Sequence, residues 1–332
     1  MVLIGEGAFT LRRDQNGLRP VYNLGNELGD CPYHCTFCGV GRSPKVTPEW
    51  NIAEFDRQHA AIQSEIDGPY HPLIYNQGNV TSPAEFSRRT LDHILRAFEP
   101  DPRVIFISLN SRERLTTNEL LDSLAGRGFR FPIHFILGVE SLSANAPKIL
   151  GKDTRGELER FISKLARYNR AADRRQPLAG YTFGLDASIV FLPELYLQEG
   201  QSREGRGAEI AGGLLCEVKQ LLTLFHPTVP VEINLHPYYE VASLPWKPAD
   251  LESFMLVLPL LQVEVNRHNA STPGHPTHLF VGIEGTGYEG GAEAAALARW
   301  KTFIESFNQS GRCPWEVSPS DPDRLAPSPG AA

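Results

Sequence analysis

The order of apolar and amphipathic stretches along the chain is the feature that most limits its possible folds. Short β-branched runs predict strands at 21–27, 72–79, 103–110, 132–140, 184–192, 231–238 and 278–284. Apolar residues three or four positions apart predict helices between them, including 116–125, 155–171, 208–225, 249–267 and 292–307. Strands and helices that alternate in this way imply a parallel sheet with right-handed crossovers.

The number of these units and the absence of one motif favour a closed or partly closed sheet. The six strands from 21–27 to 231–238 form six strand–helix units, and the chain has no glycine-rich dinucleotide fingerprint. A barrel is therefore favoured over an open nucleotide-binding sheet. We expect an α/β fold with a partial (β/α)6 TIM-like barrel. The expected division is an N-terminal extension at 1–20, the barrel at 21–245, a C-terminal strand and helix extension packing on it at 246–316, and a proline-rich disordered tail at 317–332.

The charge balance bears on the partners and the location of the protein. The chain has 39 acidic and 32 basic residues, a net charge of -7, and no block of five or six basic residues. Proteins that grip a nucleic-acid backbone usually present a positive face, so a nucleic-acid partner is not expected. We see neither a signal peptide nor an apolar run near the ~20 residues that span a bilayer. We therefore expect a cytoplasmic protein with a small-molecule substrate and no membrane contact.

Three of the five cysteines are Cys31, Cys35 and Cys38, in the segment LGDCPYHCTFCG. They follow the first expected strand, and active sites of parallel α/β barrels gather at the carboxyl ends of the strands. Thiolates at spacings of four and three on one loop can hold three irons of a cubane cluster and leave the fourth iron open. The sequence therefore predicts a [4Fe–4S] cluster that binds a substrate or cofactor directly.

Zinc or an inert set of thiols is the alternative. Structural zinc sites usually use two ligand pairs, and Cys216 and Cys313 are isolated in sequence. His34 lies inside the loop as a possible fourth ligand, so zinc stays open. The two isolated cysteines do not predict an auxiliary cluster.

The CxxxCxxC spacing, with the aromatic Phe37 before the third cysteine, resembles the signature of the radical S-adenosylmethionine (radical SAM) superfamily. This resemblance implies a partial (β/α)6 barrel that uses a [4Fe–4S] cluster and S-adenosylmethionine, with Phe37 beside the cofactor. Reductive cleavage of the cofactor would give a 5′-deoxyadenosyl radical that abstracts hydrogen from the substrate. An electron donor such as flavodoxin or ferredoxin is implied as a partner.

Within the superfamily, the chain looks most similar to the subgroup with the archaeosine synthase radical subunit and the elongator catalytic subunit. The similarity extends over roughly residues 20–240. The passages that carry it are LIYNQGNVTSPAEF, FISLNSRERLTTNELLDSL and GVESLSANAPKILGKDTRGELERF.

The first passage implies a cofactor contact after the second strand. Gln77, Gly78 and Asn79 occupy the place where many family members have Gly-Gly-Glu, whose backbone carbonyls accept hydrogen bonds from the methionine ammonium. The glutamate is absent here. The assignment therefore rests on the strand-end position and on the close backbone approach that Gly78 permits.

The resemblance implies further cofactor contacts at the later strands. Glu140 and Ser141 would meet the ribose hydroxyls or the ammonium, and Lys152 would pair with the methionine carboxylate. Asn234 and His236 would flank the adenine. A surface carboxylate at 140, a solvated lysine and a packed core histidine are the structural alternatives.

Polar residues on the expected strands are candidates for a substrate pocket. Buried polar groups in a barrel must be hydrogen-bonded, either to one another or to a ligand, and the sequence leaves both open. Cys216, on an expected amphipathic helix, is a weak candidate for a hydrogen donor, and the alternative is a buried cysteine that packs as a small hydrophobe. The substrate candidates are Tyr75, Asn110, Arg112 and Tyr238, and His134 and Glu232 follow the same pattern.

These features together predict a radical SAM enzyme that acts on a small polar metabolite. A sugar, nucleoside or sugar nucleotide of a natural-product pathway suits the single cluster motif, the acidic charge and the compact length. Carbon–carbon bond formation, dehydration, dehydrogenation and epimerisation are all open as outcomes. The alternatives are radical modification of a tRNA base and a non-catalytic, metal-stabilised binding module.

Overall fold

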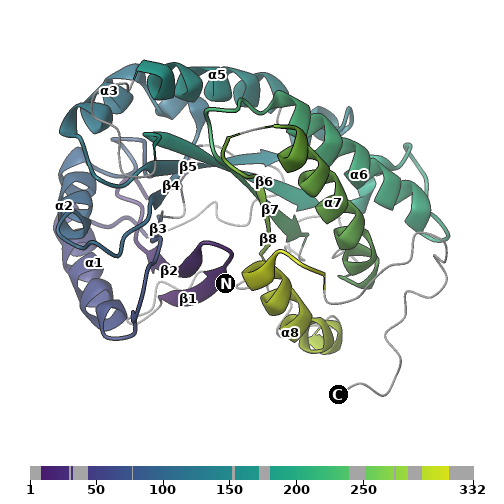
Figure 1. The fold of residues 1–332 in the computed structure, drawn as a ribbon, viewed down its shortest axis with the longest axis horizontal. Helices are drawn as coiled ribbons and strands as arrows, with labels where there is room; N and C mark the ends of the chain where they lie inside the picture. The colour runs from purple at the N-terminus through teal and green to yellow at the C-terminus, as the bar shows by residue number, and fades with distance from the viewer. Residues whose placement is uncertain are drawn as a thin grey trace.

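Eight strands form a single curved sheet in which the spatial order is the sequence order (Figure 1). The computed structural model describes residues 9–29, 31–32, 44–76, 78–151, 154–171, 180–238, 251–272, 274–282 and 294–313. Strands β2 to β8 are parallel, and β1 pairs antiparallel with β2. The strands are β1 (Thr10–Asp14), β2 (Gly17–Asn23), β3 (Leu73–Tyr75), β4 (Ile107–Ser111), β5 (Ile133–Glu140), β6 (Phe183–Phe191), β7 (Val231–Pro237) and β8 (His278–Val281).

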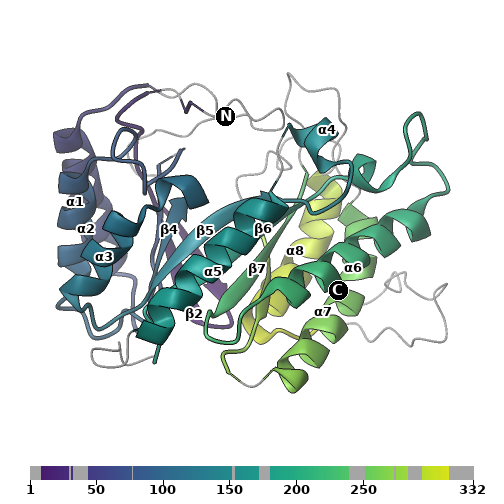
Figure 2. The same cartoon turned by 90° about the horizontal axis from the view of Figure 1, so that it is seen from above.

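Helices cover the outer face of this sheet (Figures 1 and 2). Helix α8 instead contacts both β1 and β8, at the two edges of the sheet. The described part of the chain has no helix with the length and apolar composition to span a bilayer. The α-helices are α1 (Pro48–Gln63), α2 (Arg88–Phe98), α3 (Asn118–Arg127), α4 (Ala146–Leu150), α5 (Arg155–Ala171), α6 (Gly207–Leu224), α7 (Leu251–Ser271) and α8 (Ala294–Ser310), and the 3-10 helices are η1 (Glu113–Leu115) and η2 (Pro193–Tyr196).

The architecture confirms the α/β barrel-like fold expected from the sequence and adds to it. Because β8 pairs with β7, the sheet has seven parallel strands, and β1 adds an antiparallel edge. The expected strand at 21–27 is displaced, since β2 begins at Gly17 as the second arm of a hairpin. Strands expected at 72–79 and 103–110 are shorter, at β3 and β4.

The two faces of the sheet differ in chemistry. Tyr22 on the outer face packs against Phe55 of α1 at a ring distance of 5.2 Å, and Phe135 packs against Phe161 of α5 at 5.6 Å. Successive side chains of a strand point to opposite faces. The neighbours of these apolar residues therefore point into the lumen, where many are polar.

A buried ion cluster around Arg19 fills the lumen near the amino-terminal ends of the strands. Arg19 on β2 pairs with Glu232 on β7 at 2.5 Å, with Asp186 on β6 at 3.2 Å and with Asp14 on β1 at 3.7 Å. Asp14 also meets the Nε2 atom of His71 at 2.9 Å. These side chains are all below 9% exposed, so one guanidinium joins three strands across the lumen.

The cluster continues through Asp186 to His134 and Tyr181, also near the amino-terminal ends of the strands. Asp186 meets the Nδ1 atom of His134 at 3.0 Å and accepts a hydrogen bond from Ser108 at 2.9 Å. The other ring nitrogen of His134 lies 2.8 Å from the Tyr181 hydroxyl. His134 and Glu232 are thus satisfied by protein groups, which answers the question that the sequence left open for them.

The carboxyl groups of the cluster have shifted pKa values. Burial raises the pKa of Glu232 to about 8, although the charge of Arg19 opposes this shift. Burial also acts to raise the pKa of Asp186, but its bonds to His134 and the charges of His134 and Arg19 lower it overall. Burial therefore favours the protonated form of Glu232 more than that of Asp186.

The β1–β2 turn closes the seam between the two edges of the sheet. Gln15 lies 2.7 Å from His278 Nδ1 and donates a hydrogen bond to the Leu279 carbonyl at 3.3 Å. The Arg19 guanidinium lies over the Phe280 ring at 5.3 Å. Side chains therefore connect β8 with the β1–β2 hairpin and close the partial barrel.

Asparagine side chains of three helices form hydrogen bonds with backbone groups at the ends of strands. In each case the amide oxygen accepts a hydrogen bond from a backbone N–H and the amide nitrogen donates one to the carbonyl of the same residue. This pairing satisfies backbone groups where the sheet ladder ends. The pairs are Asn169 with Phe183, Asn269 with Thr277, and Asn308 with Val281.

Replacing Glu232 by glutamine tests the ion cluster. The folded state keeps the Glu232 proton up to about pH 8, whereas the unfolded chain loses it near pH 4.5. The folded state therefore binds more protons over this range, and the Glu232 contribution to stability falls as pH rises, by at most about 1.4 kcal/mol per pH unit. In urea titrations from pH 5 to 9, Glu232→Gln is expected to gain stability relative to the wild type. If the free energies of unfolding of the two proteins changed equally with pH, the raised pKa of Glu232 would be contradicted.

Candidate functional site

Polar side chains meet on the inner face at the carboxyl ends of β2, β3 and β4. Asn23 is paired with Tyr75 in the ladder, and Tyr75 and Asn110 come one residue after the Ile74–Leu109 pair. Tyr75 and Asn110 are both partly exposed. The structure therefore brings together two of the predicted substrate residues, and Asn23 joins them as a neighbour that the sequence did not single out.

A second polar group lies on the same inner face, on β6 and β7. Ser188 is paired with Asn234, and Val190 with His236. Asn234 is 4% exposed, while Ser188 and His236 keep part of their surface exposed. The two residues predicted to flank the adenine therefore share one strand and one face, two positions apart.

His236 is held as a neutral imidazole. Burial lowers the pKa of His236 to about 4, and the charges of Arg12 and Arg19 act in the same direction. The ring lies against Gly282, where any Cβ would overlap it. A neutral imidazole can accept one hydrogen bond and donate another, so His236 can orient a polar ligand without carrying charge.

The end of β5 has an unusual backbone. Glu140 has a φ of 63°, in the left-handed region, and a bulge interrupts the β5–β6 register beside it. Such a conformation in a non-glycine residue costs free energy and needs support from its surroundings. The Glu140 side chain is partly exposed at the strand end, as expected for a ligand contact or a surface carboxylate.

The turn after Glu140 is supported by a buried carboxylate. Glu217 of α6 accepts hydrogen bonds from the Leu142 N–H and, at 2.5 Å, from the Tyr196 hydroxyl. Burial raises the pKa of Glu217. The Ser141 carbonyl accepts a hydrogen bond from Thr154 at 2.9 Å. Ser141 is 1% exposed, and its hydroxyl accepts a hydrogen bond from the Ser143 N–H at 3.0 Å within this turn.

The loop after β3 is packed against side chains of the same chain. The space beside Gly78 is filled by the Glu85 carboxylate and the Asn26 amide of the same chain, and any Cβ on Gly78 would overlap them. Asn79 donates to Glu85 through its backbone N–H at 3.1 Å and through its side chain at 3.0 Å. Gly78 is therefore needed for contacts within the protein, and Asn79 is committed to Glu85. Glu85 lies in the LIYNQGNVTSPAEF passage, but it is not among the residues predicted from the sequence.

Cys31 lies beyond the carboxyl end of β2, after a loop that includes Gly29 with a φ of 97°. It is partly buried. The other residues predicted around it are outside the described residues, so their positions stay predictions. In the described part of the chain, no three His, Cys, Asp or Glu side chains are grouped to hold a metal ion. The predicted site residues that lie outside the described part of the chain are Cys35, Phe37, Cys38, Gln77 and Lys152.

The remaining predicted residues lie in different surroundings. Arg112 is partly exposed just after β4, next to the predicted substrate group. Tyr238 is 2% exposed and belongs to the hydrophobic core. Cys216 is exposed on the outer helix α6, so the expectation of a buried small hydrophobe is wrong. That position also faces solvent instead of the lumen, which gives no support to a hydrogen-donor role.

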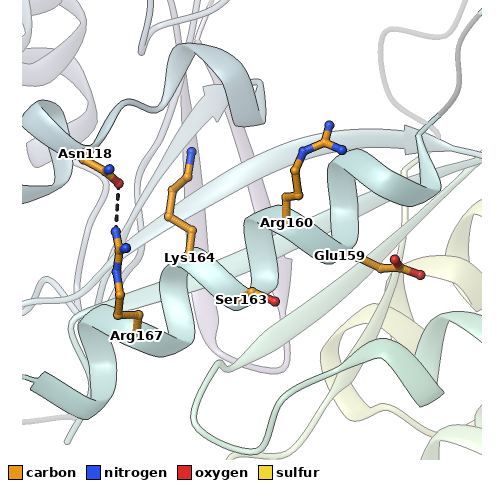
Figure 3. A pocket seen from close by; sticks show the side chains of 6 residues that line it. All are labelled: Asn118, Glu159, Arg160, Ser163, Lys164 and Arg167. Carbon is orange, nitrogen blue, oxygen red and sulfur yellow. Dashed lines mark hydrogen bonds between the residues drawn. The ribbon is translucent and has the colours of Figure 1, made fainter.

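A surface cleft of about 440 Å³ lies between α5 and the start of α3 (Figure 3). Lys164 in this cleft pairs with Glu113 at 2.6 Å, and Arg167 donates to Asn118 at 2.9 Å. The cleft is on the outer side of the helices and contains none of the predicted site residues. Its cations serve to join α5 to η1 and α3.

Comparisons with known proteins found no matching family model and no matching curated protein. A radical SAM methyltransferase from Sphaerobacter thermophilus is similar in structure, with 14% identity and a TM-score of 0.45 over 85% of this chain and 75% of that one. A mutant of spore photoproduct lyase has 13% identity and a TM-score of 0.44 over 76% of this chain and 74% of that one. At these values neither similarity assigns a function to the chain.

Replacing Glu140 tests the backbone conformation at the end of β5. Glycine enters the left-handed region freely, whereas alanine pays the same steric cost as glutamate. Glu140→Gly is expected to unfold with a free energy about 1 kcal/mol higher than Glu140→Ala. Urea denaturation of the two variants measures this difference. An alanine variant as stable as the glycine variant would show that the position is not strained.

Replacing Gly78 by alanine tests the packing beside Glu85. The new methyl group would overlap the Glu85 carboxylate and the Asn26 amide, which is expected to cost about 1–3 kcal/mol of stability. Gly126→Ala is the matched control, because nothing lies within 4 Å of a Cβ at that position in α3. The control is expected to be neutral or slightly stabilising. Equal effects of both substitutions on the melting temperature would contradict the close packing.

Proposed function

We propose that this protein is a radical SAM enzyme in which Cys31, Cys35 and Cys38 hold a [4Fe–4S] cluster. The observation that carries the proposal is the CxxxCxxC segment directly after β2 of a parallel barrel, with Cys31 beyond the carboxyl end of that strand. Three thiolates leave one iron open, which suits a cofactor that binds the cluster. A purely structural cluster would have no use for the open position.

The described residues fit a cofactor and a substrate at the same end of the barrel. A reduced [4Fe–4S] cluster with S-adenosylmethionine bound supplies a 5′-deoxyadenosyl radical. The inner-face groups around Tyr75 and Asn110, and around Asn234 and His236, would bind and orient polar ligands by hydrogen bonds. The buried Arg19 cluster lies on the amino-terminal side of the lumen, away from these groups.

We further propose that the substrate is a small polar metabolite such as a sugar, nucleoside or sugar nucleotide. The inner-face groups that support this choice are neutral amides, a phenol and an imidazole, which suit hydroxyl-rich ligands. The net charge of -7 argues against an RNA backbone as the main partner. A flavodoxin or ferredoxin would supply the electron.

Anaerobic reconstitution with iron and sulfide tests the proposal. With dithionite and S-adenosylmethionine, the rebuilt protein is expected to release 5′-deoxyadenosine, detected by chromatography. Cys31→Ala is expected to abolish this release, because a cluster ligand is lost. Cys216→Ala is the matched control and is expected to leave it unchanged, since that thiol lies exposed on α6.

The other outcomes select between functions. Tetrahedral zinc in the purified protein, or a loaded cluster without 5′-deoxyadenosine, would favour a metal-stabilised binding module. Sub-micromolar, strongly salt-dependent binding of tRNA would favour modification of a tRNA base.

A further inference from the structure

Two buried carboxylates lie in or beside the loop that leads to Cys31. Glu27, on that loop, is 9% exposed, and Glu85, at the end of the β3–α2 loop, is 1% exposed. The Glu27 backbone N–H donates to the Glu85 carbonyl at 2.9 Å, so the two residues are held side by side. At most about 14 Å of chain separates Glu27 from Cys31, because each residue spans no more than about 3.6 Å.

Uncharged donors surround the carboxylate of Glu27. One oxygen accepts hydrogen bonds from the Asn51 amide at 3.0 Å and the Thr90 hydroxyl at 2.7 Å. The other oxygen accepts from the Ser87 N–H at 2.8 Å. Because both oxygens act as acceptors, Glu27 has the hydrogen-bond pattern of an ionised carboxylate.

Glu85 repeats this pattern. One of its oxygens accepts from the Asn79 N–H at 3.1 Å and from the Asn26 amide at 3.3 Å. The Asn79 amide also donates to the other oxygen at 3.0 Å. In the described part of the chain, neither Glu27 nor Glu85 forms an ion pair with a lysine, arginine or histidine. The buried acids of the Arg19 cluster, in contrast, share a guanidinium.

Unpaired buried charges act over a longer range than exposed ones. Solvent screens an exposed carboxylate, while a buried one acts through a medium of lower dielectric constant. Reduction adds one electron to an iron–sulfur cluster, and nearby negative charge opposes that addition. The net charge around a cluster is one of the properties that set its reduction potential.

We propose that Glu27 and Glu85 tune the cluster of this protein to a low reduction potential by stabilising its oxidised state. This inference rests on the proposed function, since it needs a cluster on Cys31. It assigns to the two acids an electrostatic role in addition to their hydrogen bonds. A low potential makes the reduced cluster a stronger electron donor to a bound sulfonium cofactor.

A redox titration of the reconstituted protein, followed by electron paramagnetic resonance, tests the proposal. Glu27→Gln and Glu85→Gln each remove a charge while keeping the shape and part of the hydrogen bonding. Each is expected to raise the potential, with a roughly tenfold change in the ratio of reduced to oxidised cluster at fixed potential, or about 59 mV for one electron. The double variant is expected to shift further in the same direction.

Three control variants separate the effect of charge from that of structure. Glu49→Gln removes a carboxylate that is 64% exposed on α1, so no shift is expected. Thr90→Val removes a hydrogen bond to Glu27 but keeps its charge, so it is expected not to raise the potential. Glu85→Asp keeps the charge and is expected to stay near the wild-type potential.

The possible results distinguish this inference from the proposed function. Wild-type protein that forms no cluster would remove the proposed function and the inference with it. A wild-type cluster with unchanged potentials in both glutamine variants would overturn the inference alone. A shift in Thr90→Val as large as in Glu27→Gln, or failure of both glutamine variants to load iron, would assign the two acids a structural role instead.

Discussion

The buried ion cluster around Arg19 is the interaction on which the rest of the barrel depends. A sheet with its strands in sequence order has two free edges, and side chains across the lumen must hold them together. Arg19 contributes by joining β2 to β6 and β7 across the lumen and by lying over the Phe280 ring of β8. Its loss would leave several carboxyl groups buried without a cation, an arrangement that typically costs about 3–5 kcal/mol.

The lumen is divided into two layers by this cluster. Near the amino-terminal ends, polar groups such as His134 and Glu232 satisfy one another and form a closed floor. Near the carboxyl ends, Tyr75, Asn110 and His236 keep exposed surface on the inner face. The layer with exposed polar side chains is therefore at the carboxyl ends of the strands, the end at which the chain leads from β2 to Cys31. Glu27 and Glu85, on the Cys31 side, accept hydrogen bonds from amides and hydroxyls. The acids near the amino-terminal ends of the strands pair with Arg19 instead.

The sequence predicted the parallel order of the sheet because apolar, β-branched runs are a local signal. It also placed Asn234 and His236 on one strand, which the structure confirms. It did not specify α2, although the spacing of Leu91, Ile94 and Phe98 would have located that helix. Helix α1 has fewer large apolar residues, and its start depends on capping by Thr47 and on Pro48, which are weaker signals.

What the sequence determined by itself is the fold class and the cysteine spacing, because strand and helix periodicity and ligand spacing are properties of nearby residues. Only the tertiary structure decided which polar groups pair with one another. Arg19 and Glu232 are 213 residues apart in sequence, and no local pattern relates them. The same holds for Glu85, which reaches Asn26 across 59 residues and fills the space beside Gly78. These pairings depend on the closure of the barrel, because a buried polar group must form hydrogen bonds with the groups that the tertiary structure brings near it.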